Sequence, residues 1–331
     1  MTQTTATPAR AGDTIEVIVH RRQTLADGIA GIELRALDGA PLPAFTAGAH
    51  IDVHLPNGLV RQYSLCNDPG ESDHYALGIL LDPDGRGGSR CVHESLLEGS
   101  TLRIGPPRNL FALVPARHSI LLAGGIGITP MLAMAAQLTR DDRSFELHYC
   151  ARTPARMAFR DRLEAAAYAS RVRCYFDDAP GPERFAAAAV LSDPDPELHA
   201  YVCGPQGFMD YVIGALRARG WREECIHFES FSAPALDAAS AGEFEVQIGH
   251  GGPVIPIPAD RSVAQALAEA GVEIPLSCEQ GICGTCALRV LEGTPDHRDM
   301  YFTDAEKAAN ERFTPCCSRS LSPRLVVALD S

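Results

Sequence analysis

Several features of common protein classes are missing from this sequence. No apolar run reaches the length of a membrane span, and residues 1–12 lack the apolar core of a signal peptide. Positive charge is scarce, with 29 Lys and Arg against 42 Asp and Glu, which gives a net charge of −13. Nucleic-acid binding needs a basic surface, so that function is disfavoured. No internal repeat of fixed period is present, which excludes a repeat architecture.

Cysteine, in contrast, is abundant. Eleven cysteines without a signal peptide indicate a reducing compartment, where thiols serve as ligands or core residues, and we expect a cytoplasmic protein with no membrane attachment. The apolar fraction of 46% and the charged fraction of 21% are ordinary for a globular protein. A length of 331 residues suffices for two or three domains. We expect residues 1–12 to be disordered.

Residues 13–115 have the pattern of a small antiparallel β-barrel. Apolar and polar residues alternate in 51–55, and a turn signal at Pro56-Asn57-Gly58 separates this stretch from another strand-like run at 61–65. We therefore expect a hairpin over 51–65. Further short strands with intervening turns are typical of such a barrel.

From 116 to 231 the pattern changes to that of a doubly wound α/β domain. Residues 119–123 form a largely apolar run, as expected of a buried parallel strand. Strand-like and helix-like stretches then alternate along the chain. Pro130 is expected at the first position of the first helix, which proline favours.

The remaining residues divide into a linker and a small α+β domain. Residues 232–243 are rich in Ala and Ser, which is typical of a linker. In 244–331 an alternating strand is followed by an amphipathic helix over 263–270, which Ser262 begins and Gly271 ends. A cysteine-containing loop comes next. This order predicts a β-grasp ferredoxin domain.

Three cysteines in that loop have the spacing C-x4-C-x2-C, at Cys278, Cys283 and Cys286. A fourth candidate follows at Cys316 or Cys317. This is the plant-type spacing for a [2Fe–2S] cluster held by four thiolates. Such a cluster carries one electron at a time, so the C-terminal domain is predicted to transfer single electrons.

Other uses of these cysteines fit less well. Structural zinc sites usually pair two short knuckles, whereas the fourth cysteine here is solitary and distant. A disulfide is a still weaker explanation of this cysteine spacing. Gly281 and Gly284 allow the loop to fold around a cluster with its backbone N–H groups directed at the sulfurs.

The run Arg61-Gln62-Tyr63-Ser64 lies on a predicted barrel strand and suits a flavin site. A strand sends residues 61 and 63 to one face and residues 62 and 64 to the other. An Arg can grip a phosphate, a Tyr can lie against a flavin ring, and a Ser can hydrogen-bond the reactive flavin nitrogen. The same residues also suit an edge strand with a surface Arg and a half-buried Tyr. This motif alone therefore does not establish a flavin site.

Two glycine-containing turns are candidate phosphate sites. Each precedes a helix-like stretch, and a helix N-terminus offers free N–H groups to an anion. The second turn follows a buried strand, where small residues let the backbone approach a pyrophosphate, although it departs from the G-x-G-x-x-G fingerprint. A simple tight turn remains the alternative for both. The residues are Gly87, Gly88 and Ser89 in the first turn and Gly125, Gly127 and Thr129 in the second.

Two further residues follow predicted parallel strands, where open α/β sheets bind their ligands. Cys203 places a thiol where a nicotinamide could lie, although a buried inert cysteine is the alternative. Asp177, with Asp178, could bind ribose hydroxyls and repel a 2′-phosphate, which favours NADH over NADPH. A solvated acidic turn is the alternative, and Arg152 near another strand end argues the other way.

The order of these motifs resembles the phthalate dioxygenase reductase family over nearly the whole chain, most closely its members of vanillate O-demethylase type. The resemblance is carried by Arg61 to Asp68, Gly85 to Ser89, Gly124 to Met131, Cys203 to Met209, His227 to Phe231 and the cysteine loop. It implies a monomer that binds FMN, NADH and a [2Fe–2S] cluster and reduces a separate Rieske-type oxygenase or demethylase for an aromatic or similar small substrate. It also favours Cys316 as the fourth ligand, through the Cys-x-Ser-Arg run that it begins.

The resemblance also assigns roles to individual residues. It implies FMN contacts from the R-Q-Y-S strand and the first glycine turn, an NADH path along the second turn, and hydride transfer near Ser64 and Cys203. Phe231 is expected to approach the flavin. The full cofactor set is Arg61, Gln62, Tyr63, Ser64, Gly87, Gly88, Ser89, Gly125, Gly127, Thr129, Asp177, Cys203 and Phe231, and the metal set is Cys278, Cys283, Cys286 and Cys316.

The number of electrons that each cofactor carries sets the order of electron transfer. NADH delivers two electrons together, a cluster accepts one, and a flavin can take two and release them singly. The sequence contains no pattern for a Rieske site, a mononuclear iron triad or a haem, so oxygenation is expected on another protein. Two alternatives stay open: a reductase for a haem monooxygenase, and a non-enzymatic iron–sulfur carrier or redox sensor.

Overall fold

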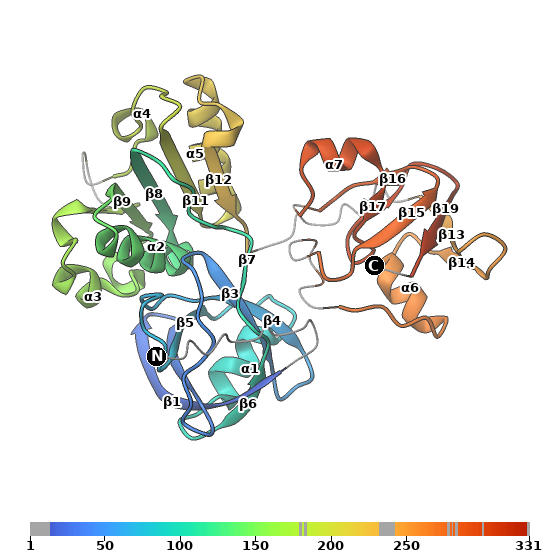
Figure 1. The fold of residues 1–331 in the computed structure, drawn as a ribbon, viewed down its shortest axis with the longest axis horizontal. Coiled ribbons are helices and arrows are strands. Elements are labelled where there is room, and N and C mark those ends of the chain that lie inside the picture. Colours follow the sequence, from blue (N-terminus) through green and yellow to red (C-terminus); the bar gives the residue numbers. More distant parts are fainter. Residues whose placement is uncertain are drawn as a thin grey trace, which may run out of the picture. The chain divides into compact units, whose positions relative to one another are not determined.

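The computed structural model describes residues 14–178, 181, 184–231, 242–276, 279, 281, 284–299 and 301–329. The chain forms two compact units, residues 1–229 and 230–331, which are described separately (Figure 1). Residues 1–12 and most of the expected linker lie outside the described residues, so the expected domain boundaries stay predictions. None of the helices in the described ranges is long and apolar enough to span a membrane.

The first part of unit 1 is an antiparallel barrel (blue to cyan in Figure 1). Its strand order is β4-β3-β6-β1-β2-β5, with β7 paired to β3. A backbone hydrogen bond from Cys66 N to Ala76 O (2.9 Å) joins the segment after β4 to β5 at the other end of this order. The elements are β1 (Ile15–Ala26), β2 (Ile29–Ala36), β3 (Ala49–His54), β4 (Val60–Ser64), β5 (Tyr75–Leu80), α1 (Gly88–Ser95), β6 (Thr101–Ile104) and β7 (Arg108–Asn109).

Alternation in the sequence explains why these strands close on a core. Val17, Val19, Ile51 and Val53 are at most 1% exposed, while the intervening residues Ile18 and Asp52 are only partly buried. Burying each such side chain stabilises the fold by roughly 1.5–3 kcal/mol. The expected hairpin is confirmed, because β3 and β4 pair antiparallel.

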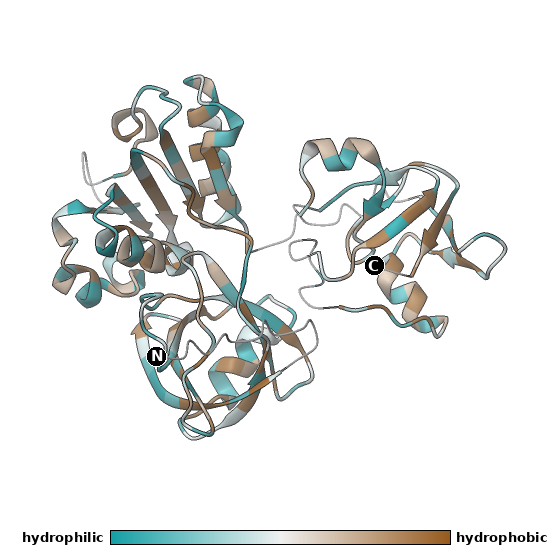
Figure 2. Cartoon of the chain, viewed as in Figure 1, coloured by the Kyte–Doolittle hydropathy of each residue, from teal (hydrophilic) through white to brown (hydrophobic). Residues whose placement is uncertain are grey.

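The second part of unit 1 is a parallel sheet of order β10-β9-β8-β11-β12. The apolar runs that predicted it appear in Figure 2 as brown strands, and β8 and β11 are almost fully buried. Short helices connect the strands. The elements are β8 (His118–Gly124), α2 (Ile128–Arg140), β9 (Ser144–Ala151), α3 (Arg160–Ala165), β10 (Val172–Phe176), α4 (Ala187–Val190), β11 (Leu198–Cys203), α5 (Gln206–Ala218) and β12 (Ile226–Glu229).

The first of these helices does not begin where the sequence predicted. Residues 125–127 form a short 3-10 helix, and α2 begins at Ile128, so Pro130 lies at its third position. The difference is physically small, because N–H groups in the first helical turn have no partner within the helix and proline lacks that group.

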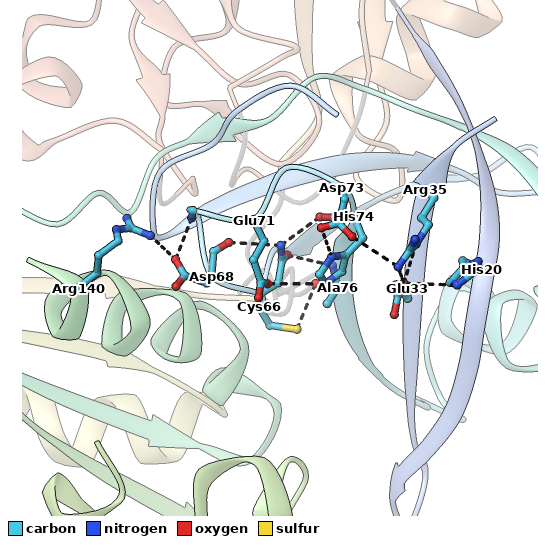
Figure 3. Close-up of polar contacts among 12 residues, drawn as sticks. His20, Glu33, Arg35, Cys66, Asp68, Glu71, Asp73, His74, Ala76 and Arg140 are labelled. Carbon is cyan, nitrogen blue, oxygen red and sulfur yellow. Dashed lines mark hydrogen bonds and ion pairs between the residues drawn. The ribbon is translucent and has the colours of Figure 1, made fainter. Parts of the chain in front are cut away.

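Polar and apolar contacts join the barrel to the parallel sheet. Arg140, at the end of α2, forms an ion pair with Asp68 in the segment after β4 (Figure 3). On β5, a Cβ at Gly78 would lie 2.9 Å from Thr129 Cγ2 and 3.0 Å from the ring of Phe159. A glycine is therefore needed for this close approach. These contacts hold the two halves as one unit.

Unit 2 is a mixed sheet of order β14-β13-β19-β15-β17 with a small β16-β18 pair (Figure 1). The buried side chains of Val246, Leu267, Phe313 and Leu325 form its core. The helix α6 begins as predicted, with Ser262 and Gln265 forming a reciprocal cap. The elements are β13 (Phe244–Ile248), β14 (Val254–Ile257), α6 (Val263–Glu269), β15 (Leu288–Glu292), β16 (Pro295–Asp296), α7 (Asp304–Ala309), β17 (Arg312–Phe313), β18 (Arg319–Ser320) and β19 (Arg324–Ala328).

Candidate functional site

Strand β4 and the start of α1 are in direct contact. A Cβ at Gly88 would lie 2.7 Å from Arg61 Nε and 2.8 Å from its Cγ, so the arginine stem packs on the bare backbone at the helix N-terminus. Gly87, the N-cap, has a φ of 88° and no side-chain cap. The first N–H groups of a helix lack partners within the helix. This arrangement fits a phosphate, with the Arg61 charge beside these donors.

The neighbouring predicted residues have distinct roles in the fold. Tyr63 is half-buried, and burial raises its pKa to about 12, so the phenol is neutral. Gln62 Nε2 donates to Asp52 Oδ1 (3.1 Å), which also accepts from Arg108. Ser89 Oγ accepts from the backbone N–H of Asp82 (3.0 Å). Gln62 and Ser89 thus already have local partners.

Ser64 reaches across the junction to the parallel sheet. Its hydroxyl donates to Glu229 Oε2 (3.2 Å), and Glu229 pairs in register with Cys203 at the ends of β12 and β11. Burial raises the pKa of Glu229 to about 8, and the Ser64 hydrogen bond opposes that shift. Burial, with the Glu229 charge second, raises the pKa of Cys203 well above its usual value. The three residues offer a neutral thiol and a carboxyl group that exchanges protons near neutral pH.

Glu229 was not selected from the sequence as a site residue. Its signal was its position, because it ends the last parallel strand at the edge where such sheets bind ligands. Only the fold shows that it meets Ser64, which lies 165 residues earlier.

The second glycine turn packs directly on the Cys203 turn. A Cβ at Gly127 would lie 2.2 Å from the carbonyl oxygen of Cys203, and Gly125 has a φ of 53°. Thr129 is 2% exposed and donates from Oγ1 to Ile126 O (3.0 Å). Glycine is therefore required where the two turns meet, and the turns lie together at the carboxyl edge of the sheet.

The acidic turn lies at the same edge. Asp177 directly follows β10, is exposed, and donates its backbone N–H to Ala151 O (3.2 Å). Arg152 follows the adjacent strand β9 and is also exposed. Both residues that bear on nucleotide choice thus stand at ends of neighbouring strands.

In unit 2, three described cysteines gather in one buried cluster. Cys286, Cys316 and Cys317 are 3%, 6% and 5% exposed. Cys278 and Cys283 lie outside the described residues, and within the described part of the chain no three potential ligands are arranged to hold a metal ion.

The described thiols fit a cluster by their chemistry. The thiol of Cys286 raises the pKa of Cys316 to about 12, while a backbone hydrogen bond from Gly281 acts in the opposite direction. Two thiolates so close need a positive partner, and the iron of a [2Fe–2S] core would supply it. Phe231 belongs to unit 2 and is 37% exposed, and its predicted flavin contact stays a prediction.

Comparison with known proteins decides the family. Residues 249–321 match the 2Fe-2S iron-sulfur cluster binding domain, and residues 121–213 match the oxidoreductase NAD-binding domain. The chain is 50% identical over 316 residues to the vanillate O-demethylase oxidoreductase of Pseudomonas sp. (strain HR199 / DSM 7063), covering 95% of this chain and 100% of that one. It superposes on phthalate dioxygenase reductase with a TM-score of 0.74 and 39% identity, covering 96% and 98% of the two chains.

The chain belongs to the phthalate dioxygenase reductase family. The protein is a multidomain oxidoreductase that transfers electrons from a nicotinamide nucleotide through a flavin to a [2Fe–2S] centre. The resemblance and the fold class expected from its sequence are confirmed. It also superposes on an intact type IV self-sufficient cytochrome P450 monooxygenase with a TM-score of 0.82 and 37% identity, covering 97% of this chain and 42% of that one.

Proposed function

We propose that this reductase uses NADH and FMN and passes single electrons to a separate oxygenase or demethylase. The observation that carries the FMN assignment is the packing of Arg61 on Gly88 at the N-terminus of α1. A terminal phosphate is small enough to be held by one guanidinium and one helix end. Gly87 and Ser89 flank this point, and Tyr63 lies on the same strand face as Arg61.

When bound, the flavin supplies the conversion between the two-electron chemistry of NADH and the one-electron chemistry of the cluster. The protein's residues provide the surroundings. Ser64 presents a hydroxyl whose proton Glu229 can supply or accept, because the carboxyl group titrates near pH 8. The neutral Cys203 thiol lines the end of β11 without adding charge. Gly125, Gly127 and Thr129 shape the turn along which the nucleotide would lie.

NADH preference follows from the acidic end of β10. Asp177 would bind ribose hydroxyls and repel the 2′-phosphate of NADPH. Arg152, at the end of β9, offers the opposite charge. We assign the larger effect to Asp177, because the exposed carboxylate of Asp178 stands next to it and adds to the repulsion of a 2′-phosphate.

Ligation of the cluster by Cys278, Cys283, Cys286 and Cys316 completes the proposal. The sequence has no site for oxygen chemistry, so the electrons leave the protein. Its relatives include a vanillate O-demethylase oxidoreductase and a phthalate dioxygenase reductase, which supports a Rieske-type partner acting on a small aromatic compound. The likeness to a self-sufficient cytochrome P450 supports a haem monooxygenase as the second candidate partner. We propose that the reductase acts as a cytoplasmic monomer.

A combined spectroscopic experiment tests this function. The purified protein should show flavin and [2Fe–2S] absorption together, and anaerobic NADH should bleach both. Heat should release a flavin that chromatography identifies as FMN. A protein with cluster absorption alone would be an electron carrier, and released FAD would overturn the FMN assignment. Reconstitution with a Rieske oxygenase and with a cytochrome P450 separates the two candidate partners.

A further inference from the structure

Asp299 carries a buried carboxylate and lies near Gly281. It has no role in the electron transfer proposed above. Its side chain is completely inaccessible to solvent. Oδ2 accepts from the backbone N–H groups of Phe302 (2.8 Å) and Tyr301 (3.1 Å), and Oδ1 accepts from Ser318 Oγ (3.3 Å). His297 Nδ1 lies 3.4 Å from Oδ1. The three hydrogen bonds from Phe302, Tyr301 and Ser318 are typical of a carboxylate held in a fixed orientation.

Gly281, in the described part of the cysteine loop, lies directly against this residue. Gly281 has a φ of 71°, and a Cβ there would lie 3.1 Å from Asp299 Cα and 2.3 Å from Cys317 Sγ. Gly284, with a φ of 69°, lies in the same way against the ring of Tyr301. A Cβ at this position would lie 2.2 Å from Tyr301 Cζ. Gly281 is therefore in close contact with Asp299, and Gly284 with Tyr301, so a side chain at either glycine would push the neighbouring segments apart.

A chain of buried hydrogen bonds connects Asp299 with the turn that carries Cys316. Ser318 donates to Asp299 and lies 3.0 Å from Thr314 Oγ1, which lies 3.2 Å from Cys317 Sγ. Thr314 and Ser318 are at most 1% exposed. Lys307 Nζ bonds the backbone oxygen of Asp299 (2.7 Å), which fixes the segment from the other side.

We propose that Asp299 is a positioning residue for the [2Fe–2S] cluster, which fixes the cysteine loop against the Cys316 turn and holds the reduction potential of the cluster down. The inference rests on the proposed ligation by Cys316. Adding an electron to a cluster near a buried negative charge is unfavourable, since little solvent screens the repulsion. The same residue contacts both segments that supply ligands. Its carboxylate accepts from Ser318 next to the Cys316 turn, and its Cα and Cβ lie against Gly281, in the manner of outer-shell groups at metal sites.

The test is Asp299→Asn in the full-length protein, with the potential followed by the electron paramagnetic resonance signal of the reduced cluster. The amide keeps the shape and loses the charge. We expect at least a tenfold rise in the ratio of reduced to oxidised cluster at a fixed potential, a shift of about 59 mV to more positive values for one electron. Asp296→Asn is the matched control, because its carboxylate is 29% exposed, pairs with Arg298 and should leave the potential unchanged.

Iron content separates the possible failures. An Asp299→Asn protein with full iron and wild-type potential overturns the proposal. If that variant loses its cluster, Ser318→Ala removes one hydrogen bond and keeps the charge, and we expect it to release iron to a chelator several times faster than wild type. Wild-type iron release from Ser318→Ala would then overturn the positioning role. Full iron in Cys316→Ser would instead contradict the ligand assignment, independently of any potential.

Discussion

Ser64 Oγ donates a hydrogen bond of 3.2 Å to Glu229 Oε2, which links the predicted flavin strand of the barrel to the last strand of the parallel sheet. The carboxyl group has a pKa raised to about 8 by burial, so it is protonated at neutral pH and ionised above. A hydroxyl next to such a group has a proton source within reach. Cys203 completes the group at the same sheet edge.

Glu229 should therefore determine the alkaline limb of NADH oxidation. The protonated acid is the form that can supply a proton, and it is lost as pH rises through about 8. We expect the rate of NADH oxidation with ferricyanide to fall above that pH in the wild type. In Glu229→Gln the fall should disappear, because the amide does not titrate. An unchanged alkaline limb in this variant would exclude Glu229 as the titrating group.

Ser64→Ala should slow NADH oxidation with little effect on flavin content. A positioned proton donor contributes about 10²–10⁴-fold to a rate, so we expect a loss of about 10²-fold in flavin reduction by NADH in stopped flow. Ser100→Ala, in a turn of the same barrel, serves as control, since Ser100 Oγ accepts from Leu97 N (3.1 Å) within its own turn. Equal rates for Ser64→Ala and wild type would remove Ser64 from the site.

Gly88 should be intolerant of any side chain if the phosphate site is correct. In Gly88→Ala the added Cβ would lie 2.7 Å from Arg61 Nε, so the guanidinium must move away from the helix end. We expect about tenfold weaker flavin binding, or about 1.4 kcal/mol, measured by fluorescence of released flavin. Gly99→Ala is a suitable comparison, because Gly99 lies in open space with a φ of 85° and tests backbone strain alone. Weakening of equal size in both would point to general destabilisation.

Substitutions of the adjacent residues Cys316 and Cys317 should have opposite effects on the cluster. Cys316→Ser should abolish or destabilise the cluster, whereas Cys317→Ser should retain it. Cys317 Sγ already lies 3.2 Å from Thr314 Oγ1, which is a structural role for a buried thiol. Iron and acid-labile sulfide per protein measure the outcome. Loss of iron from Cys317→Ser alone would reverse the ligand assignment.

Asp177 should control the choice of nucleotide. We expect kcat/KM to favour NADH, and Asp177→Ala to narrow that preference roughly tenfold, because the repelling charge is gone. Asp178→Ala, which removes the adjacent exposed acid, is the control and should change the preference for NADH less. Equal efficiency of the wild type with NADH and NADPH would contradict the assignment.

Removing unit 2 should separate electron entry from electron exit. A protein truncated after Ala233 retains the compact unit of residues 1–229, so we expect it to oxidise NADH with ferricyanide. It should fail to reduce cytochrome c efficiently or to support its oxygenase, because the cluster is absent. A normal oxygenase rate with the truncated protein would mean that the flavin reduces the partner directly.

Local patterns in the sequence were sufficient to predict the parts of the protein that depend on residues close together in the chain. The spacing of Cys278, Cys283 and Cys286, the alternation of 51–65 and the apolar run at 119–123 each report a local period or a local loop, and local rules read them directly. These features predicted the barrel, the parallel sheet and the ferredoxin domain, and the family comparisons agree.

Contacts between residues far apart in the chain became visible only in the folded protein. Ser64 and Glu229 are 165 residues apart, and their contact depends on how the barrel packs on the parallel sheet. Asp299 stands in the polar run 296–299 of the sequence, yet it is buried among donors from two segments and lies against Gly281. Burial and partner choice arise from packing of the whole chain, and they set proton affinity and local charge. No local pattern encodes them.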